Sequence, residues 1–566
     1  MALEAPDIHL SAQTGYLVFI TIFTPVSVFF VRRIVAPNAK DGHKRSRFTI
    51  TTVILYLLIL LLNVNAWYFC SPKFDDLKSN YNSPISPKLA DLKFDKFKVP
   101  GYSFIETGKE STDNMFKCSQ VEFHDDENLS ATSVMNLNKQ GDLKLARDQL
   151  RELSKTKPEY KDFFLDGEDE TEESILTNKW YKFCGSAVWL EIYNVHFMVN
   201  RIAYSKDGVR SWPTISVLTG QVFDRDWNEL TDFNFPATDL KFPGILPHII
   251  DQGRYHKLEI LGAEDPRVVL HEFTNSEGEL DQEPLIIFNS MRTEIGWKRA
   301  MHVYRPFKNP RDITRLSIKG LEPRLTEKNW APFMDGEEGT INFVYNFHPL
   351  RVLKCNIDSG ECSKVSGPKF HKDPTHNAGT LRGGTNIVPI PSELLPKKLN
   401  FRKYWFGIGR SHNRDCGCVA ELYRPHAFIL SRPQDALSFT LDYVSSLLDF
   451  NMKPETWDGK QSICEDGKSV LIPNSISYWD IEDLDDSAKP TDYMGITFST
   501  ADMHNKLVHV KGWLSHIYLV LDKQASELKQ HYADIDHTIV ENGLLGECST
   551  FLSKEYCKDT AKWQGW

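Results

Sequence analysis

Two long segments without a charged residue open the chain, Leu10–Val31 and Phe48–Pro72. Each is long enough to cross roughly 30 Å of hydrocarbon as a helix. The second is the stronger candidate, because its centre is almost wholly aliphatic and it ends on the aromatic run Trp67–Phe69, which is typical of a membrane interface. A cleaved signal peptide is the alternative, but its apolar region is usually shorter and closer to the N-terminus. We therefore predict a transmembrane signal-anchor at 48–72.

The loop between these segments predicts the orientation. Against one acid, Asp41, it holds six basic side chains: Arg32, Arg33, Lys40, Lys44, Arg45 and Arg47. By the positive-inside rule the loop is cytosolic, whether one or both segments span the membrane. Residues 1–47 then lie wholly in the cytosol, or they cross the membrane once through Leu10–Val31 before the cytosolic loop. In both cases everything after residue 72 lies in the lumen.

Beyond the anchor the pattern of apolar positions changes twice. Residues 73–180 are polar, with leucines at helical spacing over Asp142–Leu153, which predicts a lumenal stem with a helical cap. Residues 181–566 instead show short apolar runs separated by turn residues, which predicts strands and hairpins. Examples are Ala187–Tyr193, Pro284–Asn289, Thr340–Phe347, Tyr404–Gly409 and Gly495–Phe498. A mainly β body of this length suits a β-propeller or stacked sandwiches, and no sequence repeat decides between them.

The stretch Leu261–Leu270 carries the most unusual chemistry. Pro266 has no N–H and fixes its φ, so we expect it at an edge or at the first residue of a strand, and Val268–Leu270 predicts a short buried strand. Glu264 and Asp265 then lie at the mouth of that strand, with Arg267 on the same face as Asp265. A rigidly held carboxylate beside a guanidinium suits acid–base work on a sugar hydroxyl. The alternative is a structural Asp–Arg pair.

Composition restricts the partners and the cellular compartment that we expect for this chain. The 566 residues carry a formal net charge of −10 and no basic stripe outside the N-terminal loop, which argues against a nucleic-acid partner. None of the ten cysteines forms a Cys-x-x-Cys pair, so disulfides are the simpler use in a lumenal body. Cys355 and Cys362 flank a hairpin turn and are predicted to be joined. Asn128 begins a glycosylation sequon, which predicts a glycoprotein. Nothing in the sequence indicates an oligomeric state.

Four motifs follow one another at blade-like spacing: Gly262–Arg267, Glu327–Phe333, Leu381–Asn386 and Gly409–His426. Together they resemble the fungal β-1,2-mannosyltransferase family, which acts in yeast cell-wall mannan biogenesis, and the resemblance covers most of the chain from about residue 185. More distantly they resemble the β-mannoside phosphorylases, which are five-bladed propellers. The closer resemblance implies a Golgi enzyme that uses GDP-mannose as donor and a mannan or mannoprotein glycan as acceptor. The distant one implies a five-bladed β-propeller catalytic domain with its active site on the propeller axis.

The resemblance also implies roles. GDP-mannose is α-linked, so a β-mannoside requires inversion, which needs a base for the acceptor proton and no protein nucleophile. Asp265 matches the catalytic aspartate of the phosphorylases and is the predicted base, with Glu264 as the alternative. Side chains predicted to bind the donor phosphates are Arg267, Lys328, Arg382, Arg410 and His412. Residues predicted to contact sugar are Asn329, Gly383, Gly384, Asn413, Glu421, Tyr423 and His426.

The sequence does not decide whether the protein binds a metal ion or which class of reaction it performs. Asp224 and Asp226 match the Asp-x-Asp spelling with which many nucleotide-sugar enzymes hold Mn²⁺, but so short a pattern occurs by chance in an acidic chain. Two other functions are compatible with the same fold. One is phosphorolysis or hydrolysis of β-mannosides, and the other is glycan binding without catalysis.

Overall fold

A computed structural model describes residues 129–521 of the chain, together with 103–104 and 558. Within that range the gaps are 140, 158–169, 211, 248–249, 251–259, 276, 309–312, 371–380, 396, 417–418, 453–454, 457–467 and 483–490. The chain forms two compact units, Met1–Pro84 and Ile85–Trp566, and every described residue belongs to the second. Both predicted membrane segments and the predicted glycosylation site Asn128 lie outside the described residues. None of the described helices is both long and apolar enough to cross a membrane.

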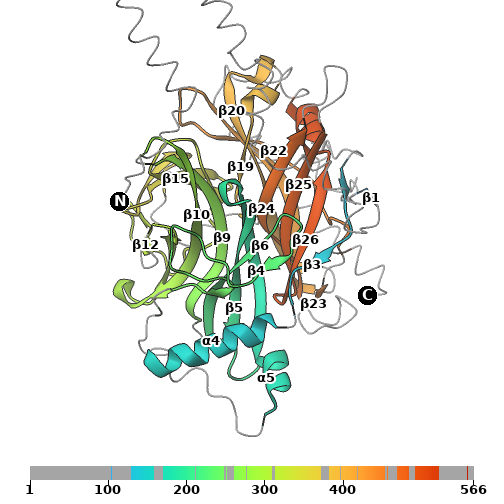
Figure 1. The fold of residues 1–566 in the computed structure, drawn as a ribbon. Helices are drawn as coiled ribbons and strands as arrows, with labels where there is room; N and C mark the ends of the chain where they lie inside the picture. The colour runs from blue at the N-terminus through green and yellow to red at the C-terminus, as the bar shows by residue number, and fades with distance from the viewer. Residues whose placement is uncertain are drawn as a thin grey trace, which may run out of the picture. The chain divides into compact units, whose positions relative to one another are not determined.

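The described body is mainly β, as the sequence predicts, and its strands fall into antiparallel groups (Figure 1). The first group is β4 (Trp180–Leu190), β5 (Val195–Tyr204) and β6 (Ile215–Phe223), with the short β7 (Glu229–Leu230) and β8 (Gly244–Ile245). The second is β9 (Leu261–Thr274), β10 (Leu280–Arg292), β11 (Lys298–Tyr304) and β12 (Ile313–Arg315). The third is β14 (Ala331–Phe333), β15 (Thr340–Phe347), β16 (Leu350–Asn356) and β17 (Glu361–Ser366), with β13 (Ser317–Ile318) pairing parallel to β17.

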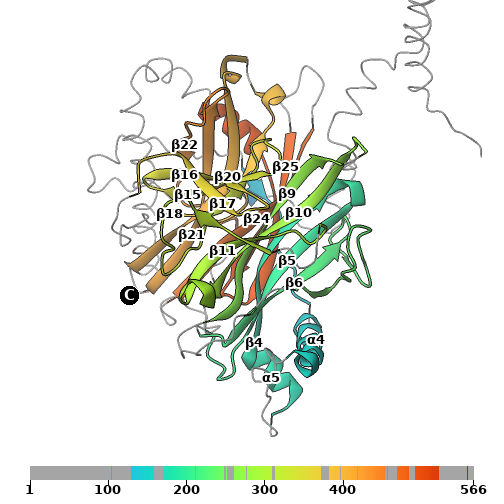
Figure 2. The same cartoon turned by 90° about the vertical axis from the view of Figure 1, so that its left-hand side faces the viewer.

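Two more groups complete the body. The fourth is β18 (Leu381–Arg382) and β19 (Val388–Ile390), both paired with β20 (Arg402–Cys416), then β21 (Val419–Pro433) and β22 (Thr440–Val444). The fifth is β24 (Lys468–Glu482), β25 (Thr491–Thr500) and β26 (His504–Lys511), with β23 (Glu455–Thr456) at its edge. Short parallel pairings of β6 with β9 and of β21 with β24 link neighbouring groups. Figure 2 shows β9–β11 between β4–β6 and β15–β17.

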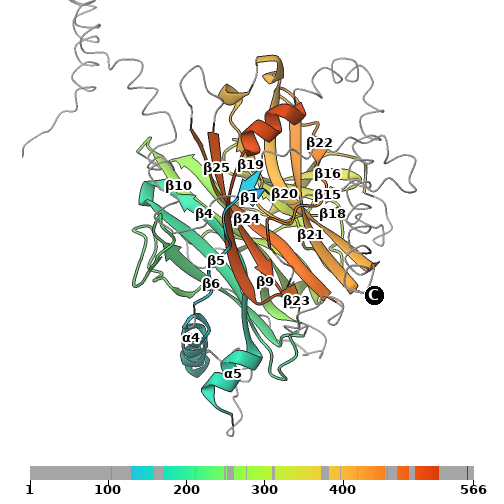
Figure 3. The ribbon, with the colours of Figure 1, turned by 90° about the vertical axis from the view of Figure 1, so that its right-hand side faces the viewer.

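Strands from the predicted stem belong to the body. β2 (Ser130–Ala131) and β3 (Met135–Asn136) both pair with β26, and β1 (Ser103–Phe104) pairs with β2 (Figure 3). The fifth group therefore combines strands from the two ends of the described chain. Its core includes Ala131, Ile496 and Val508, all fully buried.

The structure contains the strands and the helix that local sequence patterns predicted. Each predicted strand contributes to an observed one, and β15 spans the predicted residues Thr340–Phe347, whereas Ile192 and Tyr193 turn into a short 3₁₀ helix, Glu191–Tyr193. The predicted helix appears as α4 (Asp142–Thr156), which buries Ala146 and Leu150. It lies beside α5 (Glu172–Lys179), with which it shares an ion pair from Arg147 to Glu172 at 3.0 Å.

The predicted disulfide between Cys355 and Cys362 is confirmed. The two cysteines are directly opposed in the β16–β17 hairpin, with a Cα–Cα distance of 3.9 Å. Gly360 has φ +72° in the turn, a conformation that favours glycine. Because the loop is short, the bond stiffens the hairpin more than it stabilises the whole fold.

Candidate functional site

Glu264 and Asp265 lie inside β9, not at the mouth of a shorter strand as predicted. The pairing of β9 with β10 shifts here, so that Asp265 and Pro266 together face Phe288, which makes a β-bulge. Asp265 has φ +52°, which is rare for a residue with a side chain. The prediction was wrong because a bulge lets a proline continue inside a 14-residue strand.

The partner of Asp265 is Arg201 on β5, not Arg267. Arg201 Nη1 lies 2.9 Å from Asp265 Oδ1, and the thiol of Cys184 lies 3.7 Å from the same oxygen. Within the described residues, nothing hydrogen-bonds the other oxygen, Oδ2. The Asp265 side chain is 28 % exposed. One carboxylate oxygen is thus held in place while the other is open to a ligand.

The charges around Asp265 keep it ionised. Burial by itself raises the pKa of Asp265, but the nearby cations outweigh it and hold that pKa below its ordinary range. In order of effect these cations are Arg201, Lys328, Arg267 and Arg410. Three of the four are residues predicted to bind the donor, so the fold brings the predicted base and the predicted phosphate ligands together.

Glu264 is engaged on both of its carboxylate oxygens. Arg201 Nη2 lies 2.9 Å from Oε2, and Arg299 Nε lies 2.8 Å from Oε1. The side chain is only 8 % exposed. Both oxygens of Glu264 are thus occupied by guanidinium groups, whereas Asp265 keeps one oxygen open, so the geometry favours Asp265 over Glu264 as the base.

Arg267 and Arg410 are fixed by backbone carbonyls. Arg267 Nε donates to the carbonyl of Gly384, and Arg410 Nη1 donates to that of Gly383. Arg410 Nη2 also donates to Asn329 Oδ1 at 2.7 Å. The two glycines are needed for close packing, because a Cβ at Gly383 would meet the Asn329 carbonyl and one at Gly384 the Ile408 carbonyl. The two glycines thus help to orient Arg267 and Arg410, and their predicted contact with sugar stays a prediction.

Arg382 and Arg410 sit directly opposite each other on β18 and β20. Like charges in this position repel, and together with burial, the larger cause, Arg410 lowers the pKa of Arg382. Lys328 reaches solvent, but the protein atoms around its ammonium group displace part of its water. This desolvation, helped by Arg299 and Arg410 and opposed by Asp265 and Glu264, lowers its pKa. A set of mutually repelling cations is stabilised when an anion binds among them, which suits a diphosphate.

We expect Arg382→Ala to weaken donor binding more than it slows transfer. Removing one guanidinium contact with a phosphate should raise the donor KM about 10-fold while kcat falls less, because the base is untouched. Donor titration followed by steady-state kinetics measures both. Arg414, on the same strand and exposed, offers the matched control Arg414→Ala. An unchanged donor KM in Arg382→Ala would contradict the assignment.

His412, Glu421 and Tyr423 form a second small cluster on β20 and β21. The His412 and Tyr423 rings stack at 4.4 Å, and His412 Nε2 lies 3.9 Å from Glu421 Oε2. Burial lowers the pKa of His412 to about 4, although Glu421 opposes the shift. In the free protein His412 is therefore neutral near pH 7, so it can offer a phosphate an N–H but no positive charge, and its contact with the donor stays a prediction. A stacked, partly exposed pair of rings still suits sugar contact.

His426 and Asn413 have no accessible surface. The His426 ring lies between Ser411 Oγ, at 3.0 Å from Nε2, and the Ser445 carbonyl, at 3.1 Å from Nδ1. Such positions serve the core, and the arrangement does not favour the predicted sugar contact for either residue.

His426 should make stability depend on pH. Burial lowers its folded-state pKa to about 4, below the ordinary value of 6.5, so only the unfolded chain takes up this proton between the two values. We expect the free energy of unfolding contributed by His426 to be complete above about pH 6.5 and to be lost as the pH falls toward about 4. Urea unfolding across this range should give a smaller pH effect in His426→Gln. An identical pH effect in both proteins would contradict the prediction.

Residues that sequence analysis missed surround Asp265. Arg201 and Cys184 face it from the first group, and Asp502 lies in the β25–β26 turn, where it has φ +51°. Burial, then the proximity of Asp265, raises the pKa of Asp502 to about 6, with Arg201 opposing. Pairing across sheets brings these residues together, and no local motif announces it. Cys184 lies in a bulge of β4 with φ +52° and is a free thiol, and no sequence signal distinguished it from the other cysteines.

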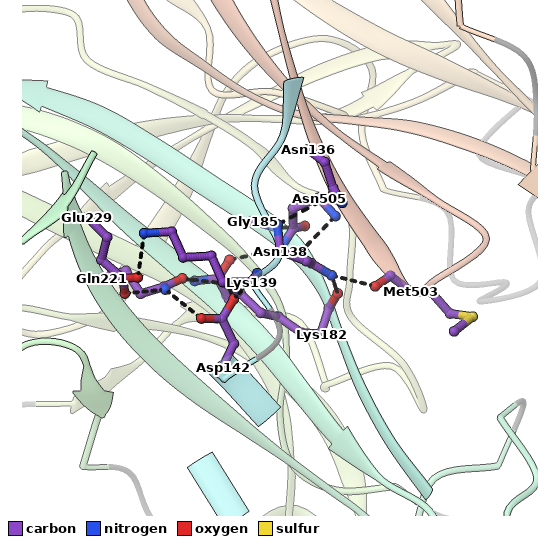
Figure 4. Close-up of polar contacts among 11 residues, drawn as sticks. Asn136, Asn138, Lys139, Asp142, Lys182, Gly185, Gln221, Glu229, Met503 and Asn505 are labelled. Carbon is purple, nitrogen blue, oxygen red and sulfur yellow. Dashed lines mark hydrogen bonds and ion pairs between the residues drawn. The ribbon is translucent and has the colours of Figure 1, made fainter. Parts of the chain in front are cut away.

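A polar network fixes the β25–β26 turn (Figure 4). Asn138 Nδ2 donates to the carbonyls of Met503, at 2.7 Å, and Lys182, at 3.0 Å. Asn505 accepts from the Gly185 N–H at 2.8 Å, next to Cys184. Behind them the buried Lys182 contacts Asp142 at 2.5 Å and Gln221 at 2.6 Å. The segment before α4 therefore holds Asp502 and the Cys184 bulge in register.

The candidate metal ligands play a local role. Asp224 accepts hydrogen bonds from the Asn228 N–H at 2.8 Å and from Asn228 Nδ2 at 3.0 Å, closing a tight turn. Across the described ranges, no group of three His, Cys, Asp or Glu side chains is arranged to hold a metal ion. We therefore derive no step through Mn²⁺.

Comparison with known proteins agrees with the site. A family model described as Beta-mannosyltransferases matches residues 117–556. Beta-mannosyltransferase 3 of Candida albicans is 49 % identical over 561 residues, covering 97 % of this chain and 98 % of its own. Beta-mannosyltransferase 4 of Komagataella phaffii is 35 % identical over 424 residues, covering 73 % and 77 %. Among solved structures, MPT-1, a GDP-Man-dependent mannosyltransferase from Leishmania mexicana, aligns with 59 % of this chain and 85 % of its own at 11 % identity and a TM-score of 0.30, too distant to carry an argument.

Proposed function

Since this chain belongs to the β-mannosyltransferase family, we propose that it transfers mannose from GDP-mannose to the α-mannan side chains of yeast cell-wall glycans, forming β-1,2 linkages with inversion. The observation that carries the proposal is the open carboxylate oxygen of Asp265 among Arg267, Lys328 and Arg410. A base next to a diphosphate-sized set of cations is what a one-step displacement on a nucleotide sugar requires.

The proposed transfer is a single displacement at C1 of mannose. The acceptor hydroxyl oxygen forms the new bond to C1 of mannose, and its proton passes to Asp265 Oδ2. The bond from C1 to the phosphate oxygen breaks, and its electron pair leaves with GDP. Arg267, Arg410 and Lys328 then stabilise the charge that develops on the leaving diphosphate.

Donor binding also prepares the base. In the free protein the cations keep the pKa of Asp265 low, which makes its carboxylate a weak base. A bound diphosphate offsets those positive charges, so the pKa of Asp265 rises once the donor is in place. The same residues thereby couple donor binding to proton removal from the acceptor.

We also propose that the body is a five-bladed β-propeller. Contacts between successive antiparallel groups support this arrangement: β4 with β9, β9 with β14, β15 with β18, β20 and β21 with β24, and β24 with β4. The groups thus follow one another in a cycle. Cys184, Asp265 and Arg382 lie near the start of β4, β9 and β18, and Lys328 comes just before β14, so four different groups contribute, as expected for a site on a propeller axis. A crystal structure with any other number of blades would overturn this proposal.

We propose that the enzyme is membrane-anchored with its body in the Golgi lumen. Its support is the sequence pattern alone, the apolar segment 48–72 after a basic loop. Protease added to sealed Golgi vesicles should spare residues 73–566. Digestion of the body without detergent would contradict the proposed membrane anchor.

The activity test uses the full chain in detergent with GDP-mannose and an α-mannooligosaccharide, with and without EDTA or added Mn²⁺. The expected product is longer by one mannose in β-1,2 linkage, identified by NMR. Phosphate-dependent cleavage of a β-mannoside would identify a phosphorylase instead. Glycan binding without turnover would identify a non-catalytic glycan-binding protein.

A further inference from the structure

The β5–β6 connection, residues 205–214, lies at the same end of the sheets as Asp265. β5 ends at Tyr204, which pairs with Trp180, the first residue of β4, and Cys184 follows four positions along that strand. The β25–β26 turn with Asp502 reaches the same place, because Asn505 and Ser499 bond to the Gly185 and Cys184 amides. The connection therefore borders the site.

Arg210 fixes the connection to the site. Its Nη1 donates to the Ala501 carbonyl at 3.2 Å, and its guanidinium lies 5.3 Å from the centre of the Tyr181 ring. Tyr181 packs in one apolar cluster with Cys184, and Met503 packs against that cluster. Arg210 is thus held beside the turn that carries Asp502.

This fixed connection presents an apolar surface to solvent. Trp212 is 53 % exposed and Val209 is 46 % exposed, and Trp212 is the only exposed tryptophan in the part of the chain that the structure describes. The Trp212 N–H donates to the Val209 carbonyl at 3.1 Å, so the two residues lie in one turn. A flat aromatic surface at the border of a sugar-handling site suits the C–H face of a pyranose ring.

The charges at this border favour a neutral ligand. Arg267, Arg382 and Arg410 come from β9, β18 and β20, whereas the residue next to the connection is the carboxylate Asp502. Arg201 and Arg210 face this side too. Arg201 is paired with Glu264 and Asp265, and the charge of Arg210 is offset by the nearby carboxylate of Asp502. A carboxylate repels a diphosphate and accepts hydrogen bonds from hydroxyl groups, so this border suits a glycan better than a nucleotide.

We propose that Trp212, with Val209 beside it, is a binding platform for the acceptor glycan, stacking on a mannose unit next to the one that receives the new bond. This inference rests on the proposed function, since it names the acceptor side of the same site. It assigns specificity for acceptor length to a loop that none of the family motifs includes.

The test compares Trp212→Ala, Trp212→Phe and the wild type as full chains. The acceptor KM for an α-mannotetraose should rise about 10-fold in Trp212→Ala, with kcat and the donor KM unchanged. Trp212→Phe should stay within about 3-fold of the wild type, because an aromatic ring remains. The matched control is Phe401→Ala, which removes an aromatic side chain that is 51 % exposed at the opposite end of β20 from His412.

A binding readout separates the two proposals. Titration of the tetraose by calorimetry, with no donor present, needs no transfer activity. If the wild type transfers no mannose but binds the tetraose, and Trp212→Ala weakens that binding, the proposed function fails and the platform stands. The platform is overturned if the wild type does not bind the tetraose, or if Trp212→Ala binds it as tightly as the wild type does.

Discussion

Asp265→Asn should lower the rate of mannose transfer by about 10²- to 10⁴-fold while the protein stays folded. The amide keeps the size of the carboxylate and one acceptor oxygen for Arg201 and Cys184, but it cannot take the acceptor proton. Donor affinity should not fall, because the phosphates contact the cations and not this side chain. Single-turnover transfer and donor titration measure the two quantities separately.

The matched control is Asp335→Asn. Asp335 is also a buried carboxylate held by an arginine, with Arg432 Nε and Nη2 at 2.8 and 2.9 Å from its oxygens. Arg432 lies opposite Lys403, whereas Arg410 of the site lies opposite Pro425, roughly 20 Å away along β21 at about 3.3 Å per residue. The control should lose stability and keep kcat. If Asp265→Asn transfers mannose near the wild-type rate, the base lies elsewhere and Asp502 becomes the next candidate.

Arg201→Ala should lower the free energy of unfolding by about 3–5 kcal/mol, the usual cost of leaving a buried charge unpaired. Arg201 binds Glu264 and Asp265 at 2.9 Å each, and its side chain is 8 % exposed. Removing it leaves Glu264 with Arg299 alone and Asp265 without its nearest cation. Urea unfolding near pH 7 gives the stability change.

The same variant should change the response to acid. The folded-state pKa of Asp265 lies below the ordinary value of 3.8, so its ionised form stabilises the fold above that value and the contribution is lost as the pH falls below it. Without Arg201 that folded-state pKa rises toward 3.8, so less stability is lost as the pH falls below 3.8, and the acidic limb of the transfer profile moves to higher pH. Arg432→Ala is the control: it should match the stability loss and leave the transfer profile in place. An unchanged acidic limb in Arg201→Ala would show that Arg201 does not tune Asp265.

Local sequence was sufficient wherever a short stretch decides its own structure. The leucine spacing over Asp142–Leu153 predicted α4, and the apolar run Thr340–Phe347 predicted β15. The turn between Cys355 and Cys362 predicted their disulfide. In each case the signal and the structure lie within about one element of each other, so side-chain periodicity or turn chemistry determines the outcome.

The site was predictable only in part. The motifs identified Asp265, Arg267, Lys328 and Arg410 correctly as neighbours, because a family resemblance carries tertiary information that composition lacks. It could not show that His412 is neutral, since that follows from burial. Nor could it show that His426 is enclosed by Ser411 and Ser445.

By itself, the sequence determined that this protein is a mainly β chain with the helix α4 before its first long strand, and it identified Asp265 as a candidate catalytic acid. It did not predict α5. Only the tertiary structure decided which side chains meet that acid. Arg201 and Cys184 come from β5 and β4, and Asp502 comes from a turn more than 200 residues later in the chain. The bulges that turn Asp265 and Cys184 toward each other arise from strand register, which depends on the pairing of whole strands and not on the residues at the bulge alone.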